Sequence, residues 1–477
     1  MLLPPSKALL RELEALLGAR GFTRDAAEME PWLVDWRGRY QGAAAAMLLP
    51  DSAAQVQAIV ARCAENRVAL VPQGGNTSLV GGATPGGDEV LLLSLRRLNR
   101  IRSVSPDDNM LVAEGGAILA AVHDAASRAG RRFPLSLGAK GSATIGGLVS
   151  TNAGGTQVLR FGTMRALVLG LEAVLPDGSF YQGLSALRKD NRGYDLRQLL
   201  IGAEGTLGVV TAASLRLVPA VGSRGVAWAG LASPADALTL LRQLELRLGD
   251  GIESFELMPA HALGLVLRHV PGTRAPLTAQ HPWHVLVEVT APQSGAEASA
   301  LLAAALEPAL ESGLVTDAAL AGGEAQADAL WRIRESIAEA ERQEGRAVKH
   351  DISVPVSAMP AFLQTATPQV EARFEGARVV AFGHLGDGNI HFNVLPPPRP
   401  DAARWVEEQG EMVTGFVHDL VGAAGGSISA EHGIGQLKRS ELVRTACPAG
   451  LRAQRAIKTA LDPHGIMNPG KLIPPGD

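Results

Sequence analysis

Short apolar runs separated by glycine turns occupy the chain from about residue 42 to residue 219. Such runs predict buried strands, and an alanine-rich stretch between two of them predicts a helix. The expected strands cover residues 68–71, 90–93, 110–113 and 167–175, and the expected helix covers residues 118–129. The many glycines of this region indicate backbone held close to a ligand. We therefore expect a mixed α/β domain here.

A second pattern begins near residue 221, where strand-like and helix-like segments alternate. The order strand, helix, strand occurs twice, at residues 226–231, 238–248 and 252–258 and then at residues 284–290, 298–310 and 314–320. This order predicts a βαβ–βαβ arrangement with an antiparallel sheet. Further helices are expected at residues 325–343, 402–421 and 451–461.

These patterns predict an α+β protein in four segments. Residues 1–41 form an N-terminal helical segment, residues 42–220 the glycine-rich domain, and residues 221–425 a second domain. Residues 426–477 form a C-terminal segment that we expect to return to the first domain. The length of 477 residues agrees with two to four structural units.

The N-terminal segment predicts an amphipathic helix rather than a signal peptide. Its leucines recur at helical spacing, and Lys7, Arg11 and Glu14 interrupt them. No apolar run approaches the roughly 20 residues that span a bilayer, so we expect a cytoplasmic protein without a membrane span. The net charge is −4, and no basic block suggests a nucleic-acid surface.

The two cysteines, Cys63 and Cys447, exclude some metal sites. They form no CxxC pair, which argues against an iron–sulfur cluster or a thiolate zinc site. Two reduced thiols are the favoured interpretation, and a disulfide between them stays open.

Glycine together with small hydroxyl residues is the first chemical pattern. Four stretches carry it, at residues 72–78, 138–147, 150–155 and 204–208. Consecutive glycines let backbone N–H groups converge on an anion, and Ser, Thr and Asn add donors. Neither GxGxxG nor GxxxxGK[ST] occurs, so a Rossmann site and a P-loop are disfavoured. Ordinary turns would explain one such stretch, but four in one domain favour a diphosphate site.

The second pattern is a predicted hairpin at residues 383–393. Apolar residues flank Gly-Asp-Gly-Asn, which is strong turn chemistry. With those four residues as the loop, Leu385 would pair with Ile390, and His384 would lie opposite His391. Directly opposed side chains have Cβ atoms about 4.5–5.5 Å apart, which suits one metal ion. Asn393 would share a face with His391. A lone histidine is more often structural, but this pair favours a metal.

The third pattern is Ser-Ile-Ser-Ala-Glu-His-Gly-Ile-Gly at residues 427–435. Glu431 could complete a His/His/Glu metal site and leave positions open for substrate. His432 would then be available as a general base near neutral pH. A surface loop is the alternative, because Glu-His-Gly is a weak signal by itself.

Two cations form the fourth pattern, Arg334 on a predicted helix and Lys349 in an apolar, strand-like segment. Near a metal they would hold a substrate carboxylate. A solvated helix face for Arg334 and an ion pair between Lys349 and Asp351 are equally open interpretations.

Together these stretches resemble the FAD-linked dehydrogenases of D-2-hydroxy acids, which include D-2-hydroxyglutarate, D-lactate and glycolate dehydrogenases. The resemblance rests on residues 72–82, 137–155, 189–211, 383–393 and 429–435, and it covers nearly the whole chain. It implies a flavin domain like that of vanillyl-alcohol oxidase at residues 42–220. Residues 221–425 would be an α+β cap domain for the substrate, with an antiparallel sheet and the metal hairpin.

The resemblance also implies residue roles. Metal ligands would be His384, His391 and Glu431, for zinc or manganese. Substrate would bind Arg334, Lys349 and Asn393, and His432 would be the base. The FAD-binding residues would be Pro72, Gly74, Gly75, Asn76, Thr77, Ser78, Gly138, Gly141, Ser142, Thr144, Gly147, Thr151, Asn152, Gly154, Glu204, Gly208, Val209 and Asn468.

The implied reaction oxidises a small D-2-hydroxy acid to the 2-oxo acid by hydride transfer to flavin, with the metal favouring loss of the hydroxyl proton. Ala338 stands where hydroxyglutarate-specific relatives carry threonine, so D-2-hydroxyglutarate leads but D-lactate, D-malate, glycolate or a longer acid stays open. The loop at residues 74–78 has no histidine or cysteine, so FAD is expected to be non-covalent.

Several alternatives remain at this point. A metal-dependent hydrolase would explain the histidines and Glu431 but not the glycine-rich domain. A catalytically silent subunit of a larger complex would not need an intact metal set. The sequence does not reveal the electron acceptor, and an electron-transfer flavoprotein, a quinone or another dye-like partner stays open. A homodimer is neither favoured nor excluded by the sequence.

Overall fold

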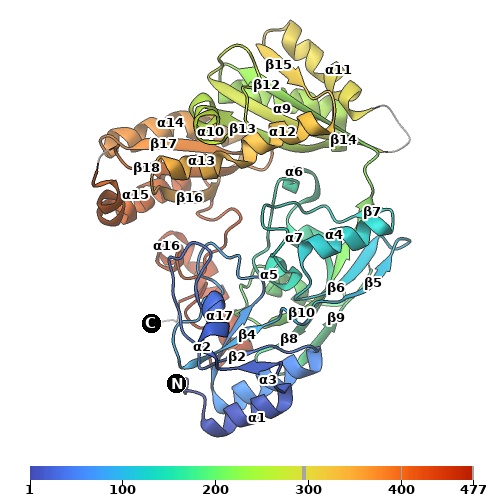
Figure 1. Cartoon of the computed structure of the whole chain (residues 1–477), viewed down its shortest axis with the longest axis vertical. Coiled ribbons are helices and arrows are strands. Elements are labelled where there is room, and N and C mark those ends of the chain that lie inside the picture. The colour runs from blue at the N-terminus through green and yellow to red at the C-terminus, as the bar shows by residue number, and fades with distance from the viewer. Residues whose placement is uncertain (188, 293–296, 399, 475–477) are drawn as a thin grey trace. The chain divides into compact units, whose positions relative to one another are not determined.

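The computed structural model describes residues 1–187, 189–292, 297–398 and 400–474. The chain divides into two compact units (Figure 1). The first contains Met1–Gly155, Phe161–Ala220 and Glu431–Asp477, and the second contains Thr156–Arg160 and Val221–Ala430. The division at 220/221 coincides with the expected one. The C-terminal segment joins the first unit from residue 431, whereas we expected residue 426.

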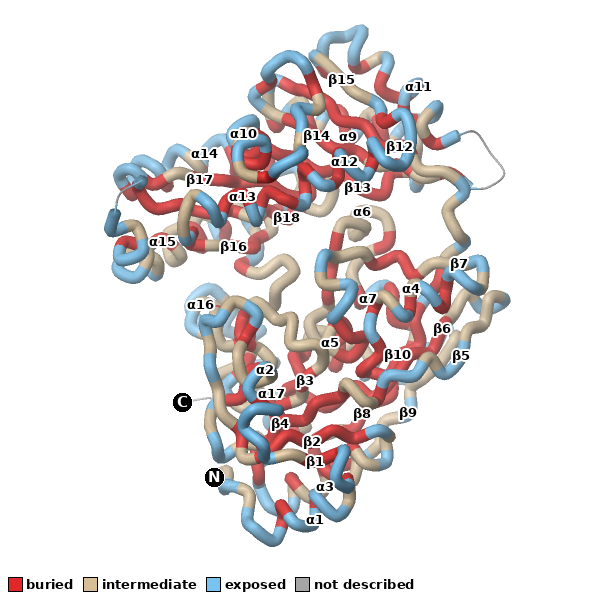
Figure 2. The backbone as a smooth tube through the Cα atoms, in the orientation of Figure 1, coloured by how far each residue is buried: buried red, intermediate tan, exposed pale blue. Residues whose placement is uncertain are grey.

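The first unit contains a four-stranded sheet of order β1-β2-β4-β3. Its strands are β1 (Phe22–Thr23), β2 (Ala46–Leu48), β4 (Val90–Ser94) and β3 (Ala69–Gln73), of which β2, β4 and β3 are parallel. Parallel strands are covered on both faces, which explains their almost unbroken apolar sequences. The strands are buried, whereas the outer face of α1 (Lys7–Leu17) is exposed (Figure 2). Helix α1 is the predicted amphipathic helix, capped by Ser6.

The other large sheet of this unit is antiparallel, with the order β5-β6-β10-β8-β9. Its strands are β5 (Ile101–Ser105), β6 (Met110–Glu114), β10 (Val209–Arg216), β8 (Val168–Val174) and β9 (Phe180–Gly183). The predicted strands at 110–113 and 167–175 correspond to β6 and β8, and the predicted helix corresponds to α4 (Leu119–Arg128). The sequence pattern did not reveal β10, although it is the central strand.

Short elements complete the first unit. They are α2 (Ala26–Leu33), α3 (Ala53–Asn66), β7 (Arg131–Arg132), α5 (Ile145–Ser150), α7 (Met164–Leu167), α8 (Leu196–Leu200), β11 (Val218–Pro219), α16 (Arg439–Thr445) and α17 (Pro448–Leu461). Helix α6 (Val158–Phe161) lies at the division between the units. The C-terminal segment reaches the parallel sheet, where the backbone of Leu70 bonds to Ile466 and Asn468.

The second unit is built on one seven-stranded antiparallel sheet of order β15-β12-β14-β13-β17-β18-β16. Its first four strands come from the predicted repeat of strand, helix and strand, and the antiparallel pairing is confirmed. These elements are β12 (Ser223–Leu231), α9 (Pro234–Leu248), β13 (Ile252–Pro259), β14 (Trp283–Ala291), α11 (Ala298–Glu311) and β15 (Asp317–Leu320). Strands β16 (Val348–Ser353), β17 (Arg378–His384) and β18 (Asn389–Leu395) extend the sheet.

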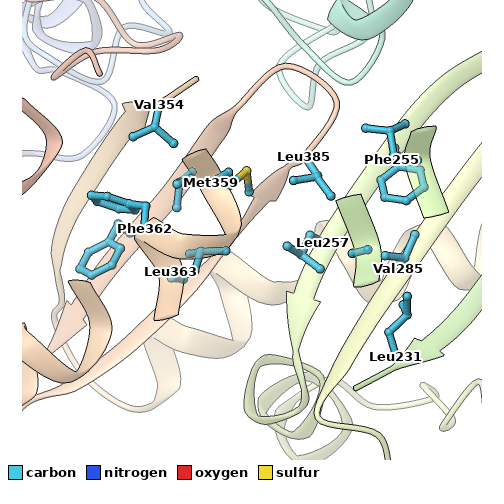
Figure 3. Close-up of a cluster of buried hydrophobic side chains, with 14 of the residues drawn as sticks. Leu231, Phe255, Leu257, Val285, Val354, Met359, Phe362, Leu363 and Leu385 are labelled. Atoms are coloured by element: carbon cyan, nitrogen blue, oxygen red, sulfur yellow. The ribbon is translucent and has the colours of Figure 1, made fainter. Parts of the chain in front are cut away.

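Side chains alternate between the two faces of this sheet, as the pleat requires. One face packs against α9, α11, α14 (Met359–Arg373) and α15 (Ala402–Ala423). Figure 3 shows part of this cluster, with Phe255, Leu257 and Val285 from the strands and Met359, Phe362 and Leu363 from α14. The other face packs against α10 (Ala260–His269), α12 (Glu324–Glu335) and α13 (Ile337–Gln343).

One predicted helix is divided in the structure. The expected helix at residues 325–343 is α12 followed by α13, with Ser336 between them. Two short 3₁₀ turns, η1 (Gly249–Gly251) and η2 (Val356–Ala358), complete the elements. Within the residues that the structure describes, no helix combines the length and the apolar character needed to cross a membrane.

Candidate active site

A cavity of about 350 Å³ lies in the first unit, lined by the four glycine-rich stretches. Pro72 is the last residue but one of the parallel strand β3, and the loop from Gly74 to Ser78 follows this strand along the cavity wall. The predicted FAD residues that line the cavity are Pro72, Gly74, Gly75, Asn76, Thr77, Ser78, Gly138, Thr144, Gly147, Thr151, Gly154, Glu204, Gly208 and Val209. Its other lining includes Glu431 and His432, the predicted ligand and base.

The walls of this cavity fit a flavin diphosphate. A Cβ atom at Gly74 would overlap the Thr144 hydroxyl, and one at Gly75 would overlap the Ser142 carbonyl oxygen. Position 75 therefore requires glycine because the overlapping atom belongs to the backbone, and at both positions the backbone can approach a ligand closely. The buried Thr144 hydroxyl has no hydrogen-bond partner among the described residues. Buried polar atoms are normally paired, so a bound group would supply the partner.

Four predicted FAD residues do not line this cavity. Gly141 and Ser142 are exposed, and Asn152 accepts a hydrogen bond from the backbone N–H of Arg165 (2.9 Å). Asn468 is buried, and its amide donates to the carbonyl oxygens of Gly82 (2.9 Å) and Glu204 (2.7 Å). Asn468 therefore holds two walls of the cavity together.

Glu204 fixes the loop that follows the predicted ligand and base. Its two carboxylate oxygens accept hydrogen bonds from the backbone N–H groups of Ile434 and Gly435, each at 2.7 Å. Burial raises the pKa of Glu204, and these two hydrogen bonds oppose the rise. The carboxylate of Glu204 thus supports the loop, and Glu204 also lines the cavity.

The histidine hairpin forms in the second unit, but its register differs from the predicted one. His384 pairs with Asn389, and Phe382 pairs with His391, so the prediction that the two histidines lie directly opposite is wrong. The loop is Leu385 to Gly388, because Gly388 adopts the positive φ of +81° that the turn needs. The two histidines are diagonal neighbours on one face, with ring centroids 5.6 Å apart.

The three predicted metal ligands come together. The ligand atoms of His384, His391 and Glu431 all lie within 4.8 Å of one another. Glu431 directly follows Ala430, whose backbone N–H donates to the carbonyl oxygen of Asp351 (3.3 Å). Two imidazoles and one carboxylate are a donor set that suits zinc and also manganese.

A buried carboxylate that the sequence analysis missed supports this set. Glu256 lies opposite His384 on β13, and its Oε1 atom accepts a hydrogen bond from His384 Nδ1 (2.6 Å). With Nδ1 as donor, Nε2 of His384 keeps its lone pair, which is the form that binds a metal. The carboxylate therefore orients the ring for coordination.

Arg334 pairs with the same carboxylate. Its Nε and Nη2 atoms both lie 2.8 Å from Glu256 Oε2, and the guanidinium stacks over the Phe382 ring (4.9 Å). Burial alone would raise the pKa of Glu256, but Arg334 and His384 outweigh burial and lower this pKa to about 2. Arg334 is itself buried, so the solvated helix face considered for it is wrong.

Lys349 and Asn393 lie opposite each other on β16 and β18. Both contact Glu341 of α13, with Lys349 Nζ 2.8 Å from Oε1 and Asn393 Nδ2 2.5 Å from Oε2. Lys349 thus forms an ion pair with Glu341, and Asp351 accepts a hydrogen bond from Asn389 (2.9 Å). By strand alternation, Lys349, Asn393 and both histidines occupy the sheet face that α12 and α13 cover.

Comparison with known proteins identifies the family of the chain. Residues 222–472 match the model for the C-terminal domain of FAD linked oxidases, and residues 44–182 match the FAD binding domain. D-2-hydroxyglutarate dehydrogenase of Xanthomonas citri is 40% identical over 97% of this chain and 96% of its own length. The mitochondrial D-2-hydroxyglutarate dehydrogenase of Bos taurus is 40% identical over 98% of this chain and 83% of its own. The chain belongs to the FAD-linked D-2-hydroxy acid dehydrogenases.

The fold of this dehydrogenase has more distant relatives among solved structures. The structure of p-cresol methylhydroxylase with substrate bound superposes with a TM-score of 0.74 at 15% identity, covering 99% of this chain and 98% of that one. The expected flavin fold, like that of vanillyl-alcohol oxidase, and the expected α+β class are therefore confirmed. Because the chain belongs to a family of FAD-dependent dehydrogenases, the alternative of a metal-dependent hydrolase is excluded.

Proposed function

We propose that this dehydrogenase depends on a divalent metal, zinc or manganese, and that D-2-hydroxyglutarate is its preferred substrate. The gathering of His384, His391 and Glu431 within 4.8 Å, with Glu256 orienting His384, is the observation that supports the metal. The names of the relatives support the substrate. D-lactate, D-malate and glycolate are the alternatives, because Ala338 offers no hydroxyl group.

The residues of the site have distinct tasks in this proposal. Arg334, Lys349 and Asn393 hold the substrate carboxylates by charge and hydrogen bonding. His432 accepts the proton of the C2 hydroxyl group, which suits an imidazole near neutral pH. When bound, a divalent metal would stabilise negative charge on an oxygen atom, and FAD would supply the acceptor for the hydride of the carbinol carbon. Electrons then pass to an electron-transfer flavoprotein or a quinone.

Anaerobic titration of the purified protein with D-2-hydroxy acids tests the substrate. We expect D-2-hydroxyglutarate to bleach the flavin absorption at the lowest concentration and its L-enantiomer to leave the absorption unchanged. Equal bleaching by both enantiomers would contradict the stereochemistry. If D-lactate, D-malate or glycolate had a lower half-saturating concentration than D-2-hydroxyglutarate, that acid would be the preferred substrate instead.

The metal needs a separate experiment. His391→Ala, or thorough chelation, should abolish flavin reduction by the D-acid while FAD stays bound and metal content falls. His269→Ala is the matched control, because His269 bonds to Glu344 (2.8 Å) and does not belong to the metal group. Full reduction after chelation to a metal-free state would refute the metal role.

A further inference from the structure

Glu341 is a fully buried carboxylate whose side chain contacts two of the predicted substrate-binding residues. It belongs to the short helix α13, which packs over the sheet face that carries the metal ligands. Its carboxylate reaches Lys349 Nζ (2.8 Å) and Asn393 Nδ2 (2.5 Å). Burying a carboxylate is costly unless it is paired, so these contacts account for its position.

The charges of the substrate-binding cations are therefore already balanced. Arg334 pairs with Glu256, and Lys349 pairs with Glu341. Each of the two cations proposed to bind substrate carboxylates therefore already contacts one carboxylate of the protein. A second carboxylate on the substrate has to share Lys349 with Glu341, and the two negative charges repel each other.

The sheet register separates Lys349, for which Glu341 and a substrate carboxylate would compete, from the predicted metal ligands. Lys349 lies opposite Asn393, and Asn393 is two residues along β18 from His391. Two residues of a strand span about 7 Å. A dicarboxylate of four or five carbons whose C1 carboxylate and C2 hydroxyl lie at the metal group can bring its far carboxylate to Lys349.

We propose that Glu341 is a specificity-determining residue that acts through Lys349 and weakens the preference for dicarboxylate over monocarboxylate D-2-hydroxy acids. The inference rests on the proposed function. If the far carboxylate and that of Glu341 each lie at hydrogen-bond distance on two sides of one ammonium group, their oxygen atoms are up to about 6 Å apart. At an effective dielectric constant of about 20, their repulsion corresponds to about 100-fold in affinity, and solvent around the half-buried Lys349 reduces this to roughly tenfold.

The test compares selectivity rather than activity. For the metal-loaded, FAD-loaded enzyme, kcat/KM is measured with D-2-hydroxyglutarate and with D-2-hydroxypentanoate, a monocarboxylate of the same chain length. Glu341→Gln should raise the ratio of the two values roughly tenfold, mainly by lowering KM for the dicarboxylate. General damage to the site lowers both values and cancels in the ratio. Glu339→Gln is the matched control, an exposed glutamate of the same helix, and should leave the ratio unchanged.

Two further variants keep the outcome decisive. Glu341→Leu removes the charge and introduces an apolar side chain of similar size. This variant replaces Glu341→Gln if the latter does not fold. Glu341→Asp keeps the charge and should keep the parent ratio. If the parent enzyme is active but Glu341→Gln and Glu341→Leu leave the ratio of the two kcat/KM values unchanged or lower it, the inference about Glu341 is wrong. The proposed function is not affected by that result. A parent enzyme that oxidises neither acid overturns the proposed function and this inference with it.

Discussion

Arg334 and Glu256 form a buried ion pair whose loss should destabilise the second unit. We consider Arg334→Met, which keeps the length of the side chain but removes its charge. Glu256 has no exposed surface. After the change, its carboxylate keeps the hydrogen bond from His384 but loses its contacts with Arg334. Arg334 and His384 together lower the pKa of Glu256 from its ordinary 4.5 to about 2 against the effect of burial, which corresponds to about 3 kcal/mol for both contacts together. Removing one partner of a buried ion pair typically costs about 3–5 kcal/mol, so we expect a loss at the lower end of this range.

The sign of the pH dependence follows from the same shift. A carboxyl group with a lowered pKa in the folded protein stabilises the fold above its unfolded value of about 4.5. This stabilisation is lost as the pH falls through about 2. Arg334→Met should therefore show a smaller loss of stability between these pH values than the parent protein.

Urea unfolding measures the coupling between Arg334 and Glu256. It compares the single variants Arg334→Met and Glu256→Gln with the double variant Arg334→Met/Glu256→Gln. We expect each single change to lower the free energy of unfolding by about 3 kcal/mol, and the double variant to recover most of the loss because no buried charge remains unpaired. Activity should stay lost in the double variant, since it lacks both the substrate cation and the support of His384. A double variant that loses the sum of both single effects would refute the pairing argument.

Three further predictions concern the cofactor, a buried histidine and the metal. Gly75→Ala should lower the FAD-to-protein absorbance ratio, because its Cβ overlaps the Ser142 carbonyl, whereas Gly141→Ala, with open space around it, should not; equal FAD content would contradict this. Burial and, to a smaller extent, His281 lower the pKa of His284 to about 4. The stabilisation from neutral His284 is complete above about pH 6.5 and is lost as the pH falls toward 4, by about 3 kcal/mol. His284→Gln should flatten that part of the stability profile, and an unchanged profile would refute it. Zinc or manganese at 100 times its Kd should add about 2.7 kcal/mol of stability, measured by thermal unfolding, and a similar gain in His391→Ala would place the metal elsewhere.

The hairpin shows how far the sequence could predict the site. Residues 383–393 predicted two strands and a glycine turn, but two four-residue loops fit that sequence equally well. The structure chooses Leu385 to Gly388, which buries Leu385 completely in the core of the second unit. The change moves the pairing by two residues, and because side chains alternate with period two, the histidines still share a face. The metal group therefore survives a wrong register.

The supporting carboxylates could not be found in this way. Glu256 is separated from His384 by 128 residues, and Glu341 is 52 residues from Asn393. Glu256 lies among apolar residues whose pattern predicts an ordinary strand, and Glu341 lies in a largely polar part of a predicted helix. Their burial depends on strand order and on the division of one predicted helix at Ser336, and neither is set by local preference.

The short piece Thr156–Arg160 has a consequence for exchanging caps between related enzymes. This five-residue piece lies between stretches of the first unit but packs with the second, so the chain crosses between units at 155/156, 160/161, 220/221 and 430/431. Arg160 and Gln157 both donate to the buried Glu253, at 2.7 Å and 3.0 Å. A chimera that transplants residues 221–430 alone would separate Glu253 from these donors. Recombination that preserves a stable cap has to carry both pieces together.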